Sequence, residues 1–268
     1  MACWRSMMKP LSIGSGLFLS FLTAVTPLSA QDASKTDTAA SPSPTAPVFS
    51  QEYRTALQEA DGLFRQKKFQ ETLAKLDEAD TIQPDQVVSL NMRGAVHTEI
   101  GEYDKAVALF NKVLEKSPDF FPAQFNLGEI LFQQGKYTEA RDHFAKLLEA
   151  HPQQNESIGF KLTLIAIRAH DRAAAEKWAE SIPFMGNTPA YYYAKAALEF
   201  DQKNADKGIS WLQSSFGIFP AVHQSFFLQS LEDMKWIARS AVQTDDGEQL
   251  NIEVLESAGG QPVAATQE

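Results

Sequence analysis

The apolar residues in the middle of the chain recur three and four positions apart, which is the spacing of an amphipathic helix. One such stripe runs from Tyr103 to Leu114, and another with the same spacing runs from Tyr137 to Leu148. A stripe covers only one side of a helix, so each helix must bury that side against a neighbouring element. The pattern therefore predicts a helical protein in which similar helices follow one another along the chain.

The two stripes belong to a repeat of 34 residues. Pro84, Pro118 and Pro152 are separated by 34 residues and again by 34. Self-similarity at a fixed period of roughly this length indicates a repeat architecture. Residues of the same kind recur in the same register, and these sets are Ala60, Gly94 and Gly128; Phe69, Tyr103 and Tyr137; Leu76, Phe110 and Phe144; Gly101 and Gly135; and Ala106 and Ala140.

Each recurring residue has a physical role in a pair of helices. Gly94 and Gly128 are small enough to let the two helices of one repeat approach closely. Gly101 and Gly135 follow a helical stretch and can adopt the left-handed conformation that ends a helix. The prolines lack an N–H group and therefore end the second helix before the next repeat begins.

These residues resemble the tetratricopeptide repeat (TPR), whose pattern has a small residue in the first helix, a Gly-x-Tyr turn, Ala and an aromatic in the second helix, and a closing Pro. The resemblance implies an all-α fold, a right-handed α-solenoid of helix-turn-helix repeats with about five TPR units plus a capping helix. The expected segments are three repeats at 53–86, 87–120 and 121–154, two degenerate TPR-like repeats within 155–220, and a capping helix at 221–243.

Residues 1–30 have the three parts of a secretory signal peptide, namely a basic start with Arg5 and Lys9, an apolar run, and the small Ala30 before the cut. We expect cleavage near Ala30 and a periplasmic or secreted protein. An uncleaved membrane anchor is the alternative, since the apolar run approaches the length of a bilayer span.

Two further segments lack the apolar residues that a packed fold requires. Residues 31–52 are rich in Ala, Ser, Thr and Pro and predict a disordered linker. Residues 244–268 carry six acidic residues and no basic ones. They predict a disordered acidic tail, in which Leu250 to Leu255 is the only stretch suited to docking.

The charge and cysteine content exclude several classes of function. The chain has 24 Lys and Arg against 34 Asp and Glu, a formal net charge of −10. Removing residues 1–30 leaves 22 basic and 34 acidic residues, which disfavours a nucleic-acid partner. The lone cysteine, Cys3, lies in the expected signal peptide, so disulfides, cysteine zinc sites and thiol nucleophiles are excluded from the mature chain.

The sequence also lacks the motifs of catalysis. Its five histidines are scattered along the chain, and none forms the His-Glu-x-x-His arrangement of a zinc hydrolase. There is no Gly-x-Ser-x-Gly elbow, no phosphate-binding Gly-rich loop and no dinucleotide fingerprint. We therefore expect no enzyme, no catalytic residue, no metal site and no cofactor.

In a solenoid of this kind the first helix of every pair lines a concave wall, which can bind a peptide or protein partner. Phe125 and Phe132 have an alternative interpretation as core residues, because aromatic stripes at helical spacing usually pack inside. The candidate groove residues lie on first helices outside the packing positions, and they are Leu57, Asp61, Phe64, Asn91, Thr98, Phe125, Asn126, Glu129 and Phe132.

The wall does not match the TPR subclass that clamps a C-terminal carboxylate with Lys, Asn and basic residues. The Lys and Asn positions hold Leu57 and Asp61, and the basic positions hold Pro122 and Asn126. An anionic ligand would find no compensating donors here, so the expected partner is an apolar or basic peptide or protein.

We therefore expect a non-enzymatic scaffold or adaptor that binds its partner in the concave groove in the cell envelope. One alternative is a structural spacer or subunit of an envelope assembly, which would contact partners through the convex face or the 186–242 region. Another is that the repeats are accessory to catalysis in the region from Tyr191 to His223.

Overall fold

The computed structural model describes residues 49–244, 247–255 and 264–266. The expected signal peptide and all but the end of the expected linker lie outside these described residues. Helices account for most of the chain from residue 51 to residue 233. The prediction of an α-helical solenoid is confirmed for this part of the protein.

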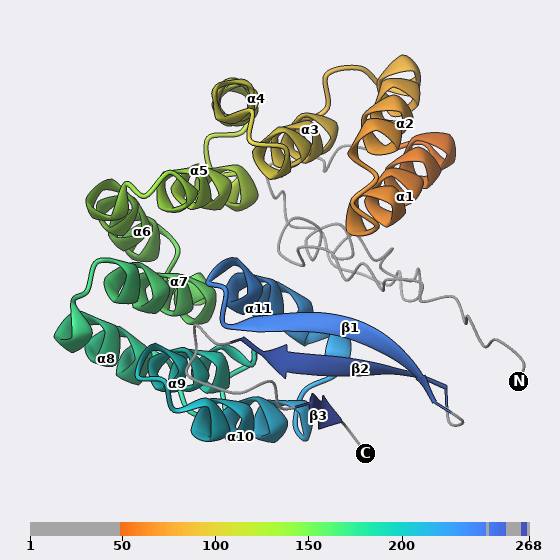
Figure 1. The fold of residues 1–268 in the computed structure, drawn as a ribbon. Coiled ribbons are helices and arrows are strands. Elements are labelled where there is room, and N and C mark those ends of the chain that lie inside the picture. Colours follow the sequence, from red (N-terminus) through yellow and green to blue (C-terminus); the bar gives the residue numbers. More distant parts are fainter. Residues whose placement is uncertain (1–48, 245–246, 256–263, 267–268) are drawn as a thin grey trace, which may run out of the picture.

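Five helix pairs follow one another in chain order, and each pair stacks on the next (Figure 1). The first helix of each pair lies on the inside of the curve in Figure 1, and the second helix lies on the outside. The pairs are α1 (Gln51–Arg65) with α2 (Phe69–Ile82), α3 (Val87–Glu99) with α4 (Tyr103–Lys116), α5 (Phe121–Gln133) with α6 (Tyr137–Ala150), α7 (Asn155–Arg168) with α8 (Arg172–Ser181), and α9 (Ala190–Asp201) with α10 (Ala205–Phe216); a short 3₁₀ turn, Pro152–Gln154, joins α6 to α7.

The small residues of the repeat do lie where two helices approach closely. A Cβ atom built on Gly94 would lie 2.5 Å from the ring of Phe110, and one on Gly128 would lie 2.7 Å from the ring of Phe144. Both rings are fully buried. The aromatic side chain of the second helix therefore fills the space that the missing glycine side chain leaves on the first helix.

The turn between the helices of a pair needs a left-handed residue. Gly101 has φ +80° and Gly135 has φ +75°. At the end of α3, the N–H of Gly101 donates to the carbonyl of Thr98, and the N–H of Glu102 donates to that of His97. These paired bonds satisfy carbonyl groups that the helix leaves without an internal partner, so the expected role of the turn glycines is confirmed.

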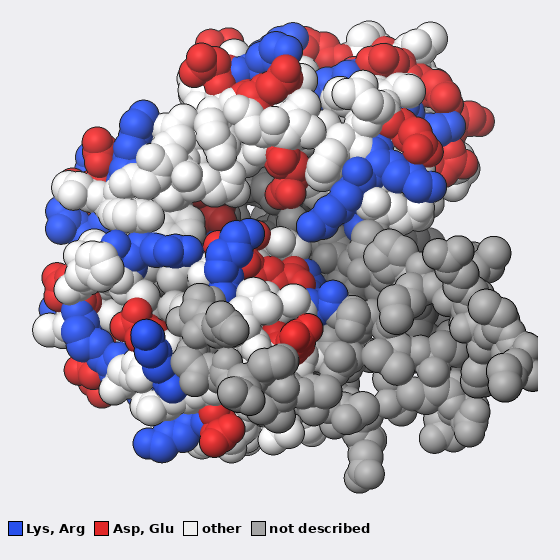
Figure 2. Space-filling model, in the orientation of Figure 1, with Lys and Arg blue, Asp and Glu red and all other residues white. Residues whose placement is uncertain are grey.

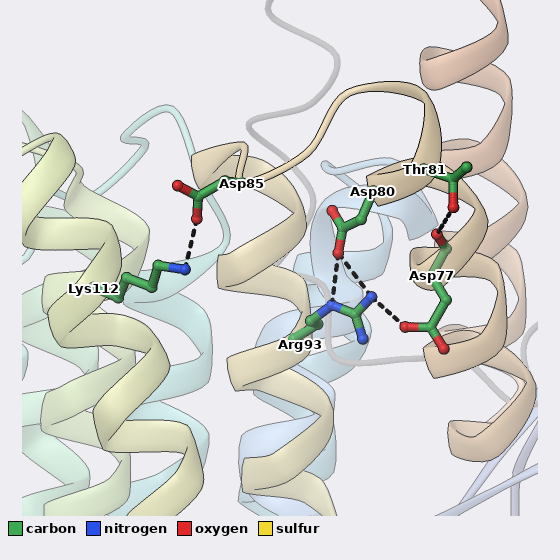
Figure 3. Close-up of polar contacts among 6 residues, drawn as sticks. All are labelled: Asp77, Asp80, Thr81, Asp85, Arg93 and Lys112. Carbon is green, nitrogen blue, oxygen red and sulfur yellow. Dashed lines mark hydrogen bonds and ion pairs between the residues drawn. The ribbon is translucent and has the colours of Figure 1, made fainter.

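Charged side chains of both signs are interspersed over the surface that Figure 2 shows, and some of them tie one repeat to the next. Arg93 on α3 donates two hydrogen bonds to the Asp80 carboxylate of α2, at 2.8 and 3.0 Å, and a third to Asp77 at 2.6 Å (Figure 3). Lys112 and Lys116 of α4 both bind Asp85 in the loop before α3. Their ammonium groups hold the pKa of the Asp85 carboxyl below its ordinary value. The first two repeats are therefore joined by ion pairs as well as by apolar contacts.

The C-terminal region differs from the prediction. The expected capping helix at 221–243 ends ten residues early, since α11 spans Ala221–Asp233 and residues 237–244 form a strand. The expected tail at 244–268 supplies two further strands within the described residues. The three strands form one antiparallel sheet in the order β1 (Ile237–Thr244), β2 (Gly247–Val254) and β3 (Ala264–Thr266).

The physical reason for this difference is a change in the period of the apolar residues. Ile252 and Val254 are buried, while Glu253 between them is exposed, which is the alternation of a strand with one buried face. Ile237 on β1 pairs with Val254 and is also buried. Lys235, with φ +64°, turns the chain between α11 and the sheet. Of the stretch from Leu250 to Leu255, residues 250–254 belong to β2, and the N–H of Leu255 donates to the carbonyl of Trp236.

We expect the substitution Gly94→Val to lower the free energy of unfolding by about 1–3 kcal/mol, because the new side chain must displace the Phe110 ring. Gly62→Val is the matched control, since a Cβ at Gly62, also inside a helix, meets no atom within 4 Å. The control should raise stability by up to about 0.5 kcal/mol through helix propensity. Urea unfolding followed by far-ultraviolet circular dichroism measures both changes, and equal effects would contradict the close approach of α3 and α4.

Candidate functional site

The structure buries much of the predicted groove. Leu57, Phe64 and Phe125 are no more than 2% exposed and belong to the hydrophobic core. The prediction that these three residues line an open groove is therefore wrong. In particular, Leu57 and Phe64 pack within the first repeat and against α3, because their side of α1 faces the neighbouring helices.

The polar residues predicted for the wall are mostly buried as well. The amide of Asn126 on α5 faces that of Asn91 on α3, with 3.4 Å between its Nδ2 and the Asn91 Oδ1. The Thr98 hydroxyl donates to the carbonyl of Gly94 within its own helix. Asp61 is partly exposed and pairs with Arg65 at 2.8 Å. These contacts leave Glu129 and Phe132 as the partly exposed members of the predicted set that lie on α5.

Helix α11 covers the concave wall of the last three repeats. The ring of Phe226 lies 6.0 Å from that of Phe125 on α5 and 6.1 Å from that of Phe160 on α7. The neighbouring Phe227 lies 5.1 Å from Phe160 and 5.3 Å from Tyr193 on α9. One helix therefore touches the first helices of three consecutive repeats, where we had expected it to close the end of the stack.

A buried glutamine fixes α11 in this position. Gln224 is fully buried, and its side-chain oxygen accepts hydrogen bonds from the hydroxyls of Tyr193 and Ser215. Its amide nitrogen donates to the carbonyl of Phe219. Because the oxygen and the nitrogen of this buried amide are both hydrogen-bonded, the glutamine specifies one position of α11 along the wall, since any shift would break these bonds inside the core.

Two adjoining hollows remain between α3, α5 and the C-terminal end of α11. Figure 2 shows the surface hollowed in this region, with acidic and basic side chains around it. The outer hollow has a volume of about 610 Å³, and its lining comprises Thr98, Glu99, Ile100, Gly101, Tyr103, Phe132, Gln133, Tyr137, Arg168, Asp233 and Lys235. The inner hollow has about 20 Å³, and its lining comprises Glu99, Phe125, Asn126, Glu129, Gln133, Lys161, Phe226, Gln229, Ser230 and Asp233.

The hollows bring together five of the nine residues predicted for the groove. Thr98 and Phe132 line the outer hollow, and Phe125, Asn126 and Glu129 line the inner one. The inner hollow is large enough for about one water molecule. A ligand of peptide size can therefore occupy only the outer hollow and reach the mouth of the inner one.

A buried ion pair forms the wall of the inner hollow. Lys161 Nζ on α7 lies 2.6 Å from Glu129 Oε2, and the two side chains are 3% and 12% exposed. The ammonium also lies over the rings of Phe226 and Phe132, at 5.0 and 5.8 Å from their centroids. Burial raises the pKa of the Glu129 carboxyl, Lys161 opposes the rise, and the charge of Asp233 adds to it.

The sequence could not reveal several residues of this site. Arg168, Asp233 and Lys235 enter it only because α11 folds back over the wall. Ile100 is 38% exposed and follows the last residue of α3. The sequence offers one signal for Ile100: an apolar isoleucine stands directly before a turn glycine, after the helix has ended.

A second exposed surface lies at the loop between α8 and α9. Phe184 and Met185 are 62% and 69% exposed, and Met185 has φ +58°, which is uncommon for a residue with a side chain. The Glu156 carboxylate fixes the base of this loop by accepting hydrogen bonds from the N–H groups of Asn187 and Thr188. The loop therefore presents two apolar side chains on a fixed backbone.

In the described part of the chain, no group of three or more His, Cys, Asp or Glu residues has the arrangement of a metal site. Within the same residues, no helix combines the length and apolar character needed to span a bilayer.

Comparison with known proteins identifies the repeats. Two family models described as tetratricopeptide repeats match residues 92–155 and 131–198. A solved structure of a thermophilic TPR protein from Thermus thermophilus aligns with 68% of this chain, and the alignment covers 98% of the Thermus chain. The two are 14% identical, with a TM-score of 0.53. The structure of PilF from Pseudomonas aeruginosa aligns with 68% of this chain, and the alignment covers 86% of the PilF chain. The two are 17% identical, with a TM-score of 0.48. At these identities the Thermus structure shows the fold alone.

Among curated proteins, the bovine DnaJ homolog subfamily C member 3 is 36% identical over 73 residues. This match covers 27% of the present chain and spans only 14% of the length of that relative. The match therefore concerns only a short part of that relative.

We expect Phe125→Ala to lower the free energy of unfolding by about 3–5 kcal/mol, because this buried ring joins α5, α6 and α11. Phe132→Ala should cost only about 1–2 kcal/mol, since that ring is partly exposed at the hollow. Tryptophan fluorescence during urea unfolding measures the difference, as Trp178, Trp211 and Trp236 all belong to or pack against the core that contains Phe125. Equal costs would contradict the packing of α11 across the wall.

Proposed function

We propose that this chain, whose residues 92–198 match models of the tetratricopeptide repeat, is a non-enzymatic scaffold that binds an extended segment of a partner protein in the outer hollow. TPR proteins bind protein partners, and the family models match the repeats that form one side of this hollow. The outer hollow is the part of the concave wall that α11 leaves uncovered. Its size is the single observation on which the proposal rests, because about 610 Å³ accommodates several side chains of a bound segment.

The lining of the hollow supports a protein partner. Tyr103, Phe132 and Tyr137 supply partly exposed aromatic side chains, which are enriched at protein interfaces. Ile100 adds an exposed apolar side chain beside them. The lining residues come from α3, α4, α5, α6 and α7 and from the end of α11, so the surface is held by the packed repeats and needs little ordering when a partner binds.

A second candidate function uses the loop with Phe184 and Met185. Its two exposed apolar side chains and fixed backbone favour the alternative that the protein is a structural subunit with its main contact in the C-terminal repeats. Phe184 lies 5.2 Å from Tyr191, which in turn lies 6.0 Å from Trp211, so an aromatic surface extends behind the loop.

We further propose that the protein acts in the periplasm or outside the cell. The support is the signal-peptide pattern of residues 1–30, which lie outside the described part of the structure. Export would place the partner in the cell envelope or beyond it.

The binding site can be tested by crosslinking in intact source cells, followed by purification of the tagged chain and quantitative mass spectrometry. Ile100→Ser should reduce capture of the specific partner about fivefold, through the loss of about 1 kcal/mol of apolar contact. Ile82→Ser is the matched control, because Ile82 is 43% exposed at a helix end outside both hollows. If the partner is still captured by Ile100→Ser but not by Phe184→Ser, binding in the outer hollow is contradicted. That result would support the second candidate function, with the main contact at the loop that carries Phe184.

Export can be tested by N-terminal sequencing of the protein recovered from its source cells. We expect the chain to begin at or within a few residues of Gln31, because Ala30 is the small residue before the expected cut. Recovery of a chain that still carries the apolar run of residues 11–25 would contradict cleavage and favour the membrane anchor.

A further inference from the structure

We propose that Arg168, in the lining of the outer hollow, binds an acidic side chain, Asp or Glu, of the partner segment that lies there. This inference rests on the proposed function and adds the chemistry that the segment must carry. It follows from the position of Arg168 in the fold, from the weak acceptors that hold its guanidinium group, and from the way in which most other arginines of the described chain are paired.

The fold fixes the main chain of Arg168 at the edge of the outer hollow. Arg168 is the last residue of α7, and its partly exposed side chain belongs to the lining of the hollow. Ile167 before it and Met234, which follows α11, are both buried. The guanidinium group is therefore presented from a packed part of the molecule, so a ligand need not order the main chain when it binds.

Two contacts hold the guanidinium group, and both acceptors are neutral. Its Nε donates to the sulfur of Met234 at 3.0 Å, and its Nη2 donates to the main-chain carbonyl of Asp233 at 3.5 Å. A thioether sulfur is a weak acceptor, and 3.5 Å is long for a hydrogen bond to oxygen. A guanidinium group carries five N–H donors, so three of them have no hydrogen-bond partner among the described residues.

Most other arginines of the described chain are paired with a carboxylate. Arg93 donates three hydrogen bonds to two aspartates (Figure 3). The arginines that also form an ion pair are Arg65, Arg141, Arg172 and Arg239. Among the described residues, Arg54 and Arg168 form none, and Arg54 bonds to the Gln51 amide on exposed α1 positions outside both hollows. Arg168 is therefore the arginine that combines a missing carboxylate with a place in a hollow.

The carboxylates that line the outer hollow leave Arg168 without an ion pair. The side chain of Asp233 accepts a hydrogen bond from Gln229 Nε2 at 2.9 Å, and only its main-chain carbonyl contacts Arg168. Glu99 comes from α3. With Lys235, the lining holds two carboxylates and two basic side chains, so no net negative charge opposes an acidic ligand.

A carboxylate suits this arginine better than its present acceptors do. It can accept two parallel N–H···O bonds from one guanidinium group, and such charge-assisted bonds are among the strongest in proteins. The apolar or basic partner expected from the sequence was inferred from wall positions such as Asn126, which the structure buries. Arg168 lies outside that set and contacts the end of α11, a neighbour that the sequence did not predict.

The test uses the purified protein and fluorescein-labelled peptide pools with an amidated C-terminus, random except for one central residue fixed as Glu, Gln or Lys. The amide removes the terminal carboxylate, so a preference for acid must come from the central side chain. Fluorescence polarisation should show the Glu pool binding about tenfold more tightly than the Gln pool, which is similar in shape but uncharged, and added salt should reduce the difference.

Arg168→Gln should remove the preference for Glu while leaving the affinity for the Gln pool and the urea unfolding midpoint close to those of the unmodified protein. Arg168→Lys keeps the charge and loses the planar pair of donors, so it should retain a preference of about threefold. Arg54→Gln is the matched control, because Arg54 also has no ion pair among the described residues and lies outside both hollows. This control should retain the full preference.

The outcomes separate this inference from the proposed function. If the Glu pool binds no more tightly than the Gln or Lys pool and Ile100→Ser weakens all three, binding in the outer hollow stands and the role of Arg168 is wrong. If no pool binds, or if Ile100→Ser weakens none of them, both proposals are overturned.

The unfolding midpoint distinguishes ligand binding by Arg168 from a purely structural role. If Arg168→Gln lowers the midpoint while the preference for Glu persists, Arg168 only stabilises the fold and the inference fails. If the midpoint and the preference fall together, Arg168→Lys decides between the two roles. A reduced preference at the original midpoint supports the inference, and an unchanged preference overturns it.

Discussion

The contact of α11 with the aromatic residues of the concave wall determines the shape of the rest of the molecule. Phe226 and Phe227 pack on Phe125, Phe160 and Tyr193, which lie on the first helices of three successive repeats. Because that part of the wall is occupied by the chain itself, a partner has access to a smaller surface than a bare solenoid would offer. The two hollows exist only because the end of α11 faces α3 and α5 across the remaining gap.

The period of 34 residues was sufficient to predict the helices, their pairing and their tightest contacts. Gly94 and Gly128 meet the rings of Phe110 and Phe144 as expected, since a repeat that stacks on itself repeats its close approaches as well. The position of α11 could not be predicted, because it depends on contacts between residues about a hundred positions apart. Nothing in the local pattern distinguishes a helix that caps a stack from one that folds back across it.

The residues of the candidate site could also be predicted only in part. The sequence located Phe132 and Glu129 on the first helix of the third repeat, but it did not reveal that Leu57 and Phe64 are core residues. Positions equivalent in register are all buried, but they contact different elements because the neighbour changes from one repeat to the next. Along the wall the equivalent residues are Leu57, Asn91 and Phe125, and only the third meets α11.

The distribution of the hydrophobic core has a consequence for how the protein unfolds. The third to fifth repeats, α11 and the sheet share one continuous core that extends from Phe121 to Val254. The first and second repeats have separate clusters, centred on residues such as Leu76 and Phe110. A plain solenoid loses its repeats one after another from either end, since each contacts only its neighbours. Here the C-terminal half is tied into a single cooperative unit, so fraying is confined to the N-terminal end, and the second repeat lies at the boundary between the part that can open locally and the part that cannot.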